Sequence, residues 1–509
     1  MKTLTITESP SQGLNRVDPA HLIKPGQVRE SKNLLPYFGK LVKTKGTTRY
    51  NTTALSYPVT WAHRFYGRRE DGSESKKSFL FAGGTTYVGN DATGALTAAQ
   101  GGFQASGYPS DETMQVSGNI VLFFFNDGLD VPYTYDGNDG NVFNKSSITL
   151  KPVQGVSWLD RLWVFEKDDN VLYYSKTLYP ENFTDSTDAG EATIGIRKGE
   201  KIMGLTIYAD TLYIFTNYTM YRIEGRTPAT FQLRIVHPSL GLAATHALVN
   251  VETTMMFLGS DYEIYSSGGT QGTTKIMSRD LDFSSMLDRN HAERVTATYH
   301  DHWVRFAYQP SDVVSGSTYN SDEILFNTLD PASSGQPKWG HIRGTRVACY
   351  SVWDRQGDKN ELVTGRSDIG CLMYHNRTDN FDGSAIETKV LTRDILLSPY
   401  RNARIKEYHI LGAPEGDYNV QFKTYLNGRT DYPTNDPLNL KGETVSLGLI
   451  NISTQVRMND RIIPDIDYSR GQSVAFEIYD NTANRAMEIY SITSVLRTKE
   501  RLTSQIVGS

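Results

Sequence analysis

Ile120-Val121-Leu122-Phe123-Phe124-Phe125 is an uninterrupted apolar run, followed by the polar turn Asn126-Asp127-Gly128 and by Tyr133-Thr134-Tyr135. Two short runs of β-branched and aromatic residues on either side of such a turn are typical of a β-hairpin. The first run does not alternate between apolar and polar residues, so both faces of its strand are expected to be covered by other parts of the protein. Sheets that stack face to face around an axis provide that cover.

The same pattern of two apolar runs separated by a polar turn recurs along the chain. Seven pairs of runs can be aligned: residues 79–81 with 87–88, 120–125 with 133–135, 162–165 with 172–174, 212–215 with 220–221, 255–258 with 264–265, 303–306 with 324–326, and 361–363 with 372–374. The first runs are spaced by about 40 to 60 residues, which is the length of one β-propeller blade. A further candidate strand precedes each hairpin, at residues 61–66, 114–116, 156–158, 202–208, 244–249, 295–299 and 347–352.

Four antiparallel strands in each repeat predict an all-β protein whose main part, residues 56–384, is a β-propeller of about seven blades. Six blades are an alternative, and so is a pair of β-sandwiches whose core strands happen to be evenly spaced. Segments with a helical period of 3.6 residues are missing from the sequence.

The pattern changes after the turn-rich link at residues 379–384. Longer candidate strands follow at residues 387–397, 404–411, 418–426, 443–450, 473–479 and 487–496. Tyr418, Val420 and Phe422 alternate with polar residues, as does the run beginning at Val474, which predicts sheets with one packed face and one wet face. Residues 385–509 are therefore predicted to form a C-terminal antiparallel β-sandwich.

The first 55 residues contain several prolines and the basic residues Lys40, Lys43, Lys45 and Arg49. They predict an extended N-terminal arm that becomes a strand near residues 47–53 and closes the propeller. As a basic stretch, the segment is more often simply solvated than a binding site.

Composition excludes several functional classes. The net charge of −5 and the pI near 6.1 provide no general attraction to nucleic acid or to anionic lipid. The two cysteines, Cys349 and Cys371, are too few for a disulfide framework or a four-ligand zinc site and are expected to be free thiols. The N-terminus lacks the apolar core of a signal peptide and no run is long enough to span a membrane, so the chain is expected to be made in a cytoplasm.

Candidate catalytic, cofactor and metal motifs are incomplete. The glycine-rich stretch from Gly268 to Lys275 lacks the ending of a P-loop, and His300-Asp301-His302 offers two imidazoles but no further ligand, so a polar turn is the preferred interpretation. Ser367-Asp368-Ile369-Gly370 approaches a sialidase Asp-box once and incompletely, and Trp353-Asp354 is a single Trp-Asp pair. No nucleophile elbow is present. We therefore expect no catalytic, cofactor-binding or metal-binding residues, and no enzyme activity.

Several segments resemble the tail hub or nozzle β-propeller proteins of short-tailed bacteriophages, the packaged-DNA stabilisation type. They are Asp160-Arg161-Leu162-Trp163-Val164-Phe165 followed by Leu172-Tyr173-Tyr174-Ser175 and Pro180-Glu181-Asn182-Phe183; residues 205–225; His237-Pro238-Ser239-Leu240-Gly241-Leu242 followed by Phe257-Leu258-Gly259 and Tyr262-Glu263-Ile264-Tyr265; and, in the arm, Asn15-Arg16-Val17-Asp18-Pro19 with Lys24-Pro25-Gly26-Gln27. The resemblance covers residues 160–380 and the arm, and its signatures are loose.

The resemblance implies a virion tail protein, assembled in the host cytoplasm, that forms a ring of six copies below the portal and the head-to-tail adaptor. Tail fibre, tailspike or needle proteins are further implied partners, and genomic DNA would leave through the channel without sequence-specific binding. A neutral or acidic channel agrees with this role, because each phosphate neutralised by Lys or Arg would hold the DNA back.

Two functions from other classes stay open. The 30 tyrosines and 6 tryptophans could stack on sugar rings, which favours a glycan-binding or glycan-cleaving propeller. A cellular protein-interaction scaffold also fits the predicted fold, although not the resemblance.

Overall fold

The computed structural model of the protein describes residues 2–68, 74–137, 140, 142–195, 197–312, 319–332, 335–355, 358–375, 378–397, 403–413, 415–416, 418–428, 434–440, 458–462 and 470–498. The chain divides into two compact units. We call Thr47–Glu323 with Gly344–Arg377 the repeat unit, and Met1–Gly46, Ile324–Arg343 and Thr378–Ser509 the terminal unit.

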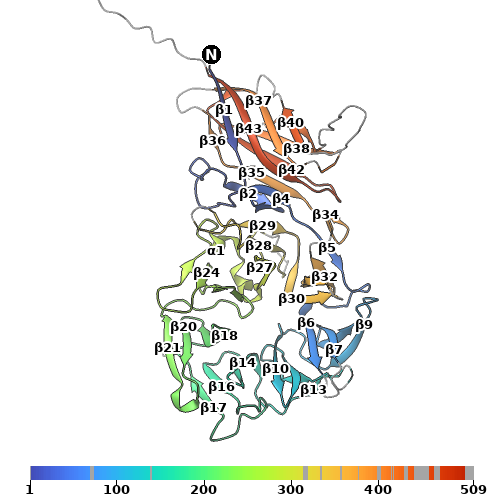
Figure 1. The fold of residues 1–509 in the computed structure, drawn as a ribbon, viewed down its shortest axis with the longest axis vertical. Helices are drawn as coiled ribbons and strands as arrows, with labels where there is room; N and C mark the ends of the chain where they lie inside the picture. The colour runs from blue at the N-terminus through green and yellow to red at the C-terminus, as the bar shows by residue number, and fades with distance from the viewer. Residues whose placement is uncertain are drawn as a thin grey trace, which may run out of the picture. The chain divides into compact units, whose positions relative to one another are not determined.

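Successive antiparallel sheets dominate the chain, each formed by strands that are neighbours in sequence (Figure 1). Their strand orders are β6 (Val59–Arg68), β7 (Glu74–Ala82), β8 (Thr85–Gly89), β9 (Leu96–Gly101); β10 (Ser110–Val116), β11 (Asn119–Phe125), β12 (Tyr133–Tyr135), β13 (Asn144–Lys145); β14 (Pro152–Trp158), β15 (Arg161–Glu166), β16 (Val171–Tyr174), β17 (Gly190–Thr193); β18 (Ile202–Tyr208), β19 (Thr211–Thr216), β20 (Met220–Glu224), β21 (Gln232–His237); β22 (Leu248–Val251), β23 (Thr254–Leu258), β24 (Ile264–Ser267), β25 (Lys275–Ile276); β26 (Thr296–His300), β27 (Trp303–Tyr308), β28 (Asp322–Asn327), β29 (Gly340–Arg343); and β30 (Val347–Arg355), β31 (Asp358–Arg366), β32 (Leu372–His375), β5 (Thr47–Arg49).

Helical structure in the described residues is limited to three short turns: α1 (Phe283–Met286) and the 3-10 turns η1 (Pro228–Thr230) and η2 (Arg289–Arg294). None of the described helices is long and apolar enough to cross a membrane. The prediction of an all-β protein is confirmed, and the predicted hairpins coincide with consecutive strands of these sheets.

Burial of β11 on both of its faces explains the apolar run that begins at Ile120. Leu122 and Phe124 pack with Phe79 of the preceding sheet, whereas Phe123 and Phe125 pack against the following sheet, which begins with β14. Each of these side chains is almost completely buried, which stabilises the fold by about 1.5–3 kcal/mol per side chain. Because a sheet covered on both sides needs no polar face, the strand does not alternate.

The first strands of the sheets contact one another in chain order, from β10 through β14, β18, β22 and β26 to β30, and β30 contacts β6. In Figure 1 the labels of β6, β10, β14, β18 and β30 surround a common centre. Last and first sheets share a cluster in which Val363 and Leu372 pack with Val59 and Leu80. The sheets of the repeat unit therefore close on themselves.

A strand from near the N-terminus completes the last sheet. β5 pairs antiparallel with β32, placing Thr47 opposite His375, Thr48 opposite Tyr374 and Arg49 opposite Met373. The strand predicted near residues 47–53 corresponds in position to β5, which pairs with β32 in this sheet. Without β5, the outer edge of β32 would present unpaired backbone groups.

Residues 1–46 differ from the extended arm predicted for residues 1–55. They belong to the terminal unit, in which β1 (Lys2–Glu8) pairs with β43 (Glu488–Thr498), and β2 (Val28–Lys32) pairs with β35 (Thr388–Thr392). The pattern within a strand does not reveal a pairing partner so distant in sequence.

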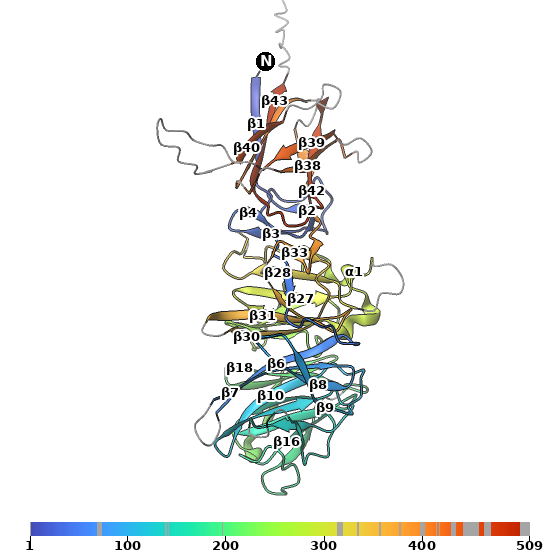
Figure 2. The same ribbon diagram turned by 90° about the vertical axis from the view of Figure 1, so that its right-hand side faces the viewer.

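Two antiparallel sheets make up most of the terminal unit. One has the order β3 (Leu34–Tyr37), β4 (Lys40–Lys43), β43, β37 (Ala403–Gly412), β40 (Met458–Ile462), with β1 beside β43 and β41 (Arg470–Gly471) beside β37; the other has the order β2, β35, β42 (Ser473–Asp480), β38 (Asn419–Leu426), β39 (Thr434–Asn439), with β36 (Ile395–Leu396) beside β42. The remaining described strands are β33 (Asn380–Phe381) and β34 (Ser384–Ala385). Figure 2 labels strands of both sheets.

Aromatic rings connect these two sheets. Tyr408 of β37 lies 5.8 Å from Phe422 of β38 and 5.2 Å from Phe476 of β42, measured between ring centroids. The predicted alternation is confirmed in β38, where Val420 and Phe422 are buried and their polar neighbours are more exposed. It fails in β42, because Lys423 covers Glu477 with an ion pair of 2.9 Å. The strand predicted at residues 443–450 lies outside the described residues.

Polar side chains tie the first strands together near the centre of the repeat unit. Ser110 of β10 donates to the carbonyl of Val153 at 2.7 Å, and Glu112 accepts from the amide of Ser157 at 3.1 Å. Desolvation of Glu112 outweighs that hydrogen bond and raises the pKa of its carboxyl to about 8. A carboxyl with this pKa binds its proton more tightly in the folded than in the unfolded chain.

Replacement of Asn51 tests the closure. Its side chain is fully buried, donates to the carbonyl of Gly370 at 3.0 Å and accepts from the amide of Leu372 at 2.8 Å. Asn51→Ala removes the acceptor of the Leu372 amide, whereas the carbonyl of Gly370 still accepts from the amide of Leu55 at 2.9 Å. The variant should lower the free energy of unfolding by about 1–3 kcal/mol. Denaturant titration measures this, with Thr52→Ala at the exposed neighbouring residue as the control. Equal stabilities of the two variants would contradict the importance of this contact.

Replacement of Glu112 tests the effect of desolvation on this partly buried carboxyl. Its stabilising contribution is complete below the ordinary pKa of 4.5 and is lost as the pH rises through about 8. Glu112→Gln retains an oxygen that accepts from Ser157 but carries no charge. The stability of this variant relative to the wild type should therefore increase between about pH 5 and about pH 9, as thermal unfolding would show. Glu191→Gln, on exposed strand β17, should show no such change.

Candidate interaction surface

The connection between β16 and β17, residues 175–189, is a loop in which side chains form several hydrogen bonds to the loop's own backbone. Asn182 accepts through Oδ1 from the amides of Thr184 and Asp185, at 3.1 and 3.2 Å. Asp185 accepts in the same way from the amides of Thr187 and Asp188, at 3.0 and 3.1 Å. Two consecutive Asx turns give the loop, which we call the 175–189 loop, a defined path.

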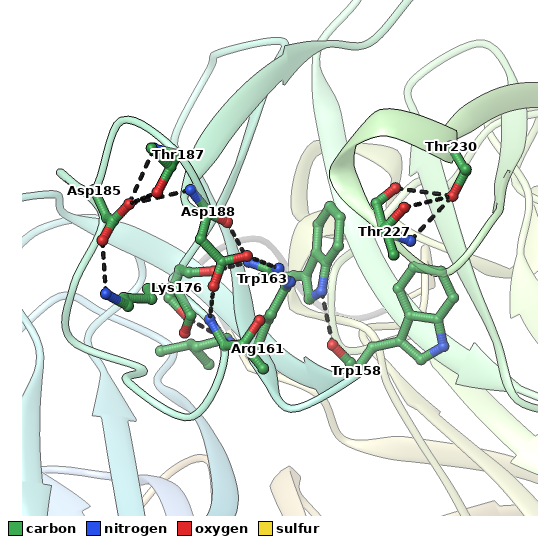
Figure 3. Close-up of polar contacts among 12 residues, drawn as sticks. Trp158, Arg161, Trp163, Lys176, Asp185, Thr187, Asp188, Thr227 and Thr230 are labelled. Carbon is green, nitrogen blue, oxygen red and sulfur yellow. Dashed lines mark hydrogen bonds and ion pairs between the residues drawn. The ribbon is translucent and has the colours of Figure 1, made fainter.

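Two ion pairs fasten the 175–189 loop (Figure 3). Arg161, whose side chain is only 5% exposed, donates to the carbonyl of Ser175 at 2.8 Å and pairs with Asp188. Lys176 pairs with Asp185 at 2.7 Å. Hydrogen bonds from Arg161 and Lys176 hold the pKa values of the Asp188 and Asp185 carboxyls below their usual range. Both acids are therefore charged at neutral pH.

Two tryptophan side chains beside the 175–189 loop are held by hydrogen bonds. Trp163 donates through Nε1 to the carbonyl of Trp158 at 3.0 Å, and Trp158 donates to the carbonyl of Asp210 at 3.1 Å. In Figure 3 these indoles lie between the 175–189 loop and the turn that contains Thr227 and Thr230. The hydroxyls of Thr227 and Thr230 lie 3.0 Å apart, so this turn is also hydrogen-bonded internally.

The tip of the loop presents two large side chains to solvent. Leu178 is 57% exposed and Tyr179 is 60% exposed. Leu178 has a φ of 66°, a left-handed conformation that is unusual for a residue of this size, and its amide donates to the carbonyl of Asp160 at 2.8 Å. Exposed apolar and tyrosine side chains on a preordered backbone suit protein recognition, because little conformational entropy is lost on binding.

A groove of about 700 Å³ adjoins the loop. Val121 and Phe123 of β11 line one side, and Pro180 and Phe183 of the 175–189 loop line the other. Glu181 fixes the rim by accepting from both the amide and the hydroxyl of Ser147, at 2.9 and 2.7 Å. The volume is that of a site for several side chains or one small ligand.

The motifs rejected in the sequence have structural roles. Asp301 and His302 form the left-handed turn between β26 and β27, as predicted, and His302 lies 3.4 Å from Glu252. Asp368 pairs with Arg346 and Arg366, each at 2.6 Å. Among the described residues, no group of three or more His, Cys, Asp or Glu side chains could hold a metal ion.

Three other expectations can be placed in the structure. The stretch from Gly268 to Lys275 is a turn that ends where β25 begins. Neither Cys349 nor Cys371 is in a disulfide, as predicted. Trp353 and Asp354 lie on β30 and line a separate pocket with Arg64.

Two segments next to and within the 175–189 loop were identified from the sequence, but the contacts that these residues form were not predicted. Asp160-Arg161 and Pro180-Glu181-Asn182-Phe183 were identified, whereas Leu178, Tyr179 and the ion pair of Lys176 with Asp185 were not. The asparagine and the two aspartates, at spacings that suit Asx turns, were the available signal.

Comparisons with known proteins give no family. No family model matches the chain, and no curated protein matches it. Among solved structures, the chain is similar to BamB from Moraxella catarrhalis, with a TM-score of 0.37 and 10% sequence identity over 74% of this chain and 98% of that chain. It is also similar to the N-terminal domain of Nup159, with a TM-score of 0.38 and 8% identity over 65% of this chain and 94% of that chain. A third similar structure is PorZ of Porphyromonas gingivalis, with a TM-score of 0.34 and 11% identity over 78% of this chain and 46% of that chain. With such low TM-scores, these likenesses say nothing about function.

Removal of the Asp185 carboxyl tests the order of the loop. Asp185→Ala frees Lys176 and deletes one Asx turn, so trypsin should cleave after Lys176 about tenfold faster than in the wild type, because cleavage follows local opening. Mass spectrometry of the fragment that ends at Lys176 measures the rate. Glu191→Ala on the adjacent strand is the control, and equal cleavage of both variants would show that the ion pair does not order the loop.

Proposed function

We propose that this protein is a structural component of a bacteriophage tail, a nozzle or hub ring below the portal and adaptor that forms part of the DNA exit channel and helps retain packaged DNA. One observation carries the proposal. Residues that resemble the tail proteins are those that hold the 175–189 loop in place: Arg161 anchors Asp188, and Asn182 forms the first Asx turn. A loop ordered in this way, with Leu178 and Tyr179 exposed, suits attachment to another protein.

The proposed architecture is a seven-bladed β-propeller with a β-sandwich formed by the two sheets of the terminal unit. The successive sheets and the contact of β30 with β6 support the propeller. Rings of Tyr408, Phe422 and Phe476 between two antiparallel sheets support the sandwich.

The proposed partners are further copies of the chain, in a ring of six, the head-to-tail adaptor, and tail fibre, tailspike or needle proteins. DNA would pass through the channel without sequence-specific contacts and without chemistry performed by this protein. A net charge of −5 supports the passage of DNA through the channel, because an excess of Lys and Arg would bind the DNA phosphates. Its place would be the virion tail, reached by assembly in the host cytoplasm.

Electron microscopy tests this proposal directly. Purified full-length chain should form rings, and an antibody against it should label the tail end of virions released from cells that carry the gene. The double variant Leu178→Ser and Tyr179→Ser, which keeps the loop anchors, should give virions with less label or fewer complete tails. Purified protein that stays monomeric, together with virions unlabelled at the tail, would contradict the proposal.

A further inference from the structure

A second concave site lies where the first and last sheets of the repeat unit meet. Its cavity of about 260 Å³ is lined by Arg64 of β6, by Asp91 beyond β8, and by Trp353, Asp354, Glu361 and Tyr374 of β30, β31 and β32. All of these residues belong to the repeat unit. Ring closure therefore assembles a site whose parts are almost 300 residues apart in sequence, as for the pair Tyr66 and Asp354.

Arg64 forms the base of this site. Its side chain is 5% exposed and binds Asp91 through two parallel hydrogen bonds, Nη1 to Oδ1 at 2.9 Å and Nη2 to Oδ2 at 2.6 Å. The guanidinium also lies 5.8 Å from the centroid of the Trp353 ring. Its Nε is buried, has no hydrogen-bond partner and faces Asp354 at 3.8 Å. A buried donor without a hydrogen bond is costly, and the nearby carboxylate of Asp354 offsets part of that cost.

Two carboxylates of the site are partly exposed. The Asp91 and Asp354 side chains are 40% and 37% exposed, and Asp91 Oδ1 also accepts from Tyr50 at 3.1 Å and from Ser78 at 2.9 Å. Both are already neutralised, Asp91 by Arg64 and Asp354 by Lys76 at 2.6 Å. Neither of these two ion pairs has an unneutralised charge that could bind an ionic ligand. A neutral ligand that both donates and accepts hydrogen bonds would meet complementary groups on the same wall.

Aromatic side chains complete the enclosure. Tyr50 packs edge-on against Trp353 and Tyr374, with centroids 5.3 and 5.7 Å away, which fixes both rings in the wall. Trp353 donates its indole N–H to Ser351 at 2.8 Å, so it offers the cavity apolar surface rather than a donor. A wall of carboxylates and cations beside aromatic rings matches a polyhydroxylated ring with polar edges and an apolar face.

We propose that this site binds one neutral sugar unit, with Asp91, Asp354 and Glu361 accepting hydrogen bonds from its hydroxyls and Tyr374 contacting its apolar face. A free monosaccharide and the terminal unit of a polysaccharide carry the same chemistry. The inference is independent of the proposed tail function, because it rests on residues outside the 175–189 loop.

Saturation-transfer NMR tests the site with the full-length protein. The probes are D-glucose, D-galactose, D-mannose, N-acetyl-D-glucosamine and L-rhamnose, each at about 10 mM, a concentration that detects binding with a millimolar Kd. At least one sugar should receive saturation from the aromatic protons of the protein. An oligosaccharide that ends in the same sugar distinguishes the two sources: tighter binding indicates a polysaccharide end, and equal binding indicates a free sugar.

Matched variants locate the binding. Asp354→Asn and Glu361→Gln keep the shape of the wall but remove charged acceptors, and each should weaken binding about tenfold. Asp210→Asn, at an exposed aspartate elsewhere that is paired with Arg226, should bind as the wild type does. Thermal unfolding of each variant verifies that it is folded.

Three results would overturn the inference. They are the absence of transfer to every sugar with folded wild-type protein, equal binding by the wild type and both pocket variants, and binding of L-arginine or L-lysine in place of the sugars. The last result would mean that the site recognises a cationic side chain.

Discussion

Pairing of β5 with β32 is the constraint on which the repeat unit depends. Apolar clusters bury side chains between neighbouring sheets from the first to the fifth, and the first and last sheets share a cluster of the same kind, which forms only if the array closes. β5 precedes the first sheet in sequence and pairs with β32 of the final sheet, so the chain itself connects the two ends. Asn51, buried directly after β5, links this strand to the backbone of Gly370 and Leu372.

Closure has consequences for both surface sites. A sheet packed on both faces holds the ends of its loops in place. In the 175–189 loop, Asp188 forms an ion pair with the buried Arg161. The pocket around Arg64 depends on closure more directly, because its wall combines the first sheet with the last. One site is an ordered loop that exposes Leu178 and Tyr179, and the other is a recess lined by the ion-paired Arg64, Asp91 and Asp354 and by Glu361.

The sequence predicted strand pairs that are close together in the chain and missed contacts between residues that are far apart in the chain. Runs such as residues 120–125 define hairpins because pairing partners lie within a few residues, and the strand near residue 47 was predicted as well. The pairing of β1 with β43 was not predicted, because alternation within a strand does not identify its partner and Lys2 lies opposite the very distant Thr498. For the same reason the sequence showed Trp353-Asp354 only as an isolated pair, although the fold places Arg64 and Asp91 beside it. Burial of Glu477 beneath Lys423 likewise depends on neighbours that alternation does not reveal.

Amide hydrogen exchange of β5 tests the account most directly. Tyr50 donates its amide to the carbonyl of Leu372 at 2.8 Å, and Thr47 is buried in the completed sheet. If closure holds the repeat unit together, the peptide containing Thr47–Arg49 and Tyr50 should be protected to the same degree as the interior strand β15, since both would exchange only by global opening. Exchange of this peptide at the rate of an unstructured segment, with β15 still protected, would contradict the account.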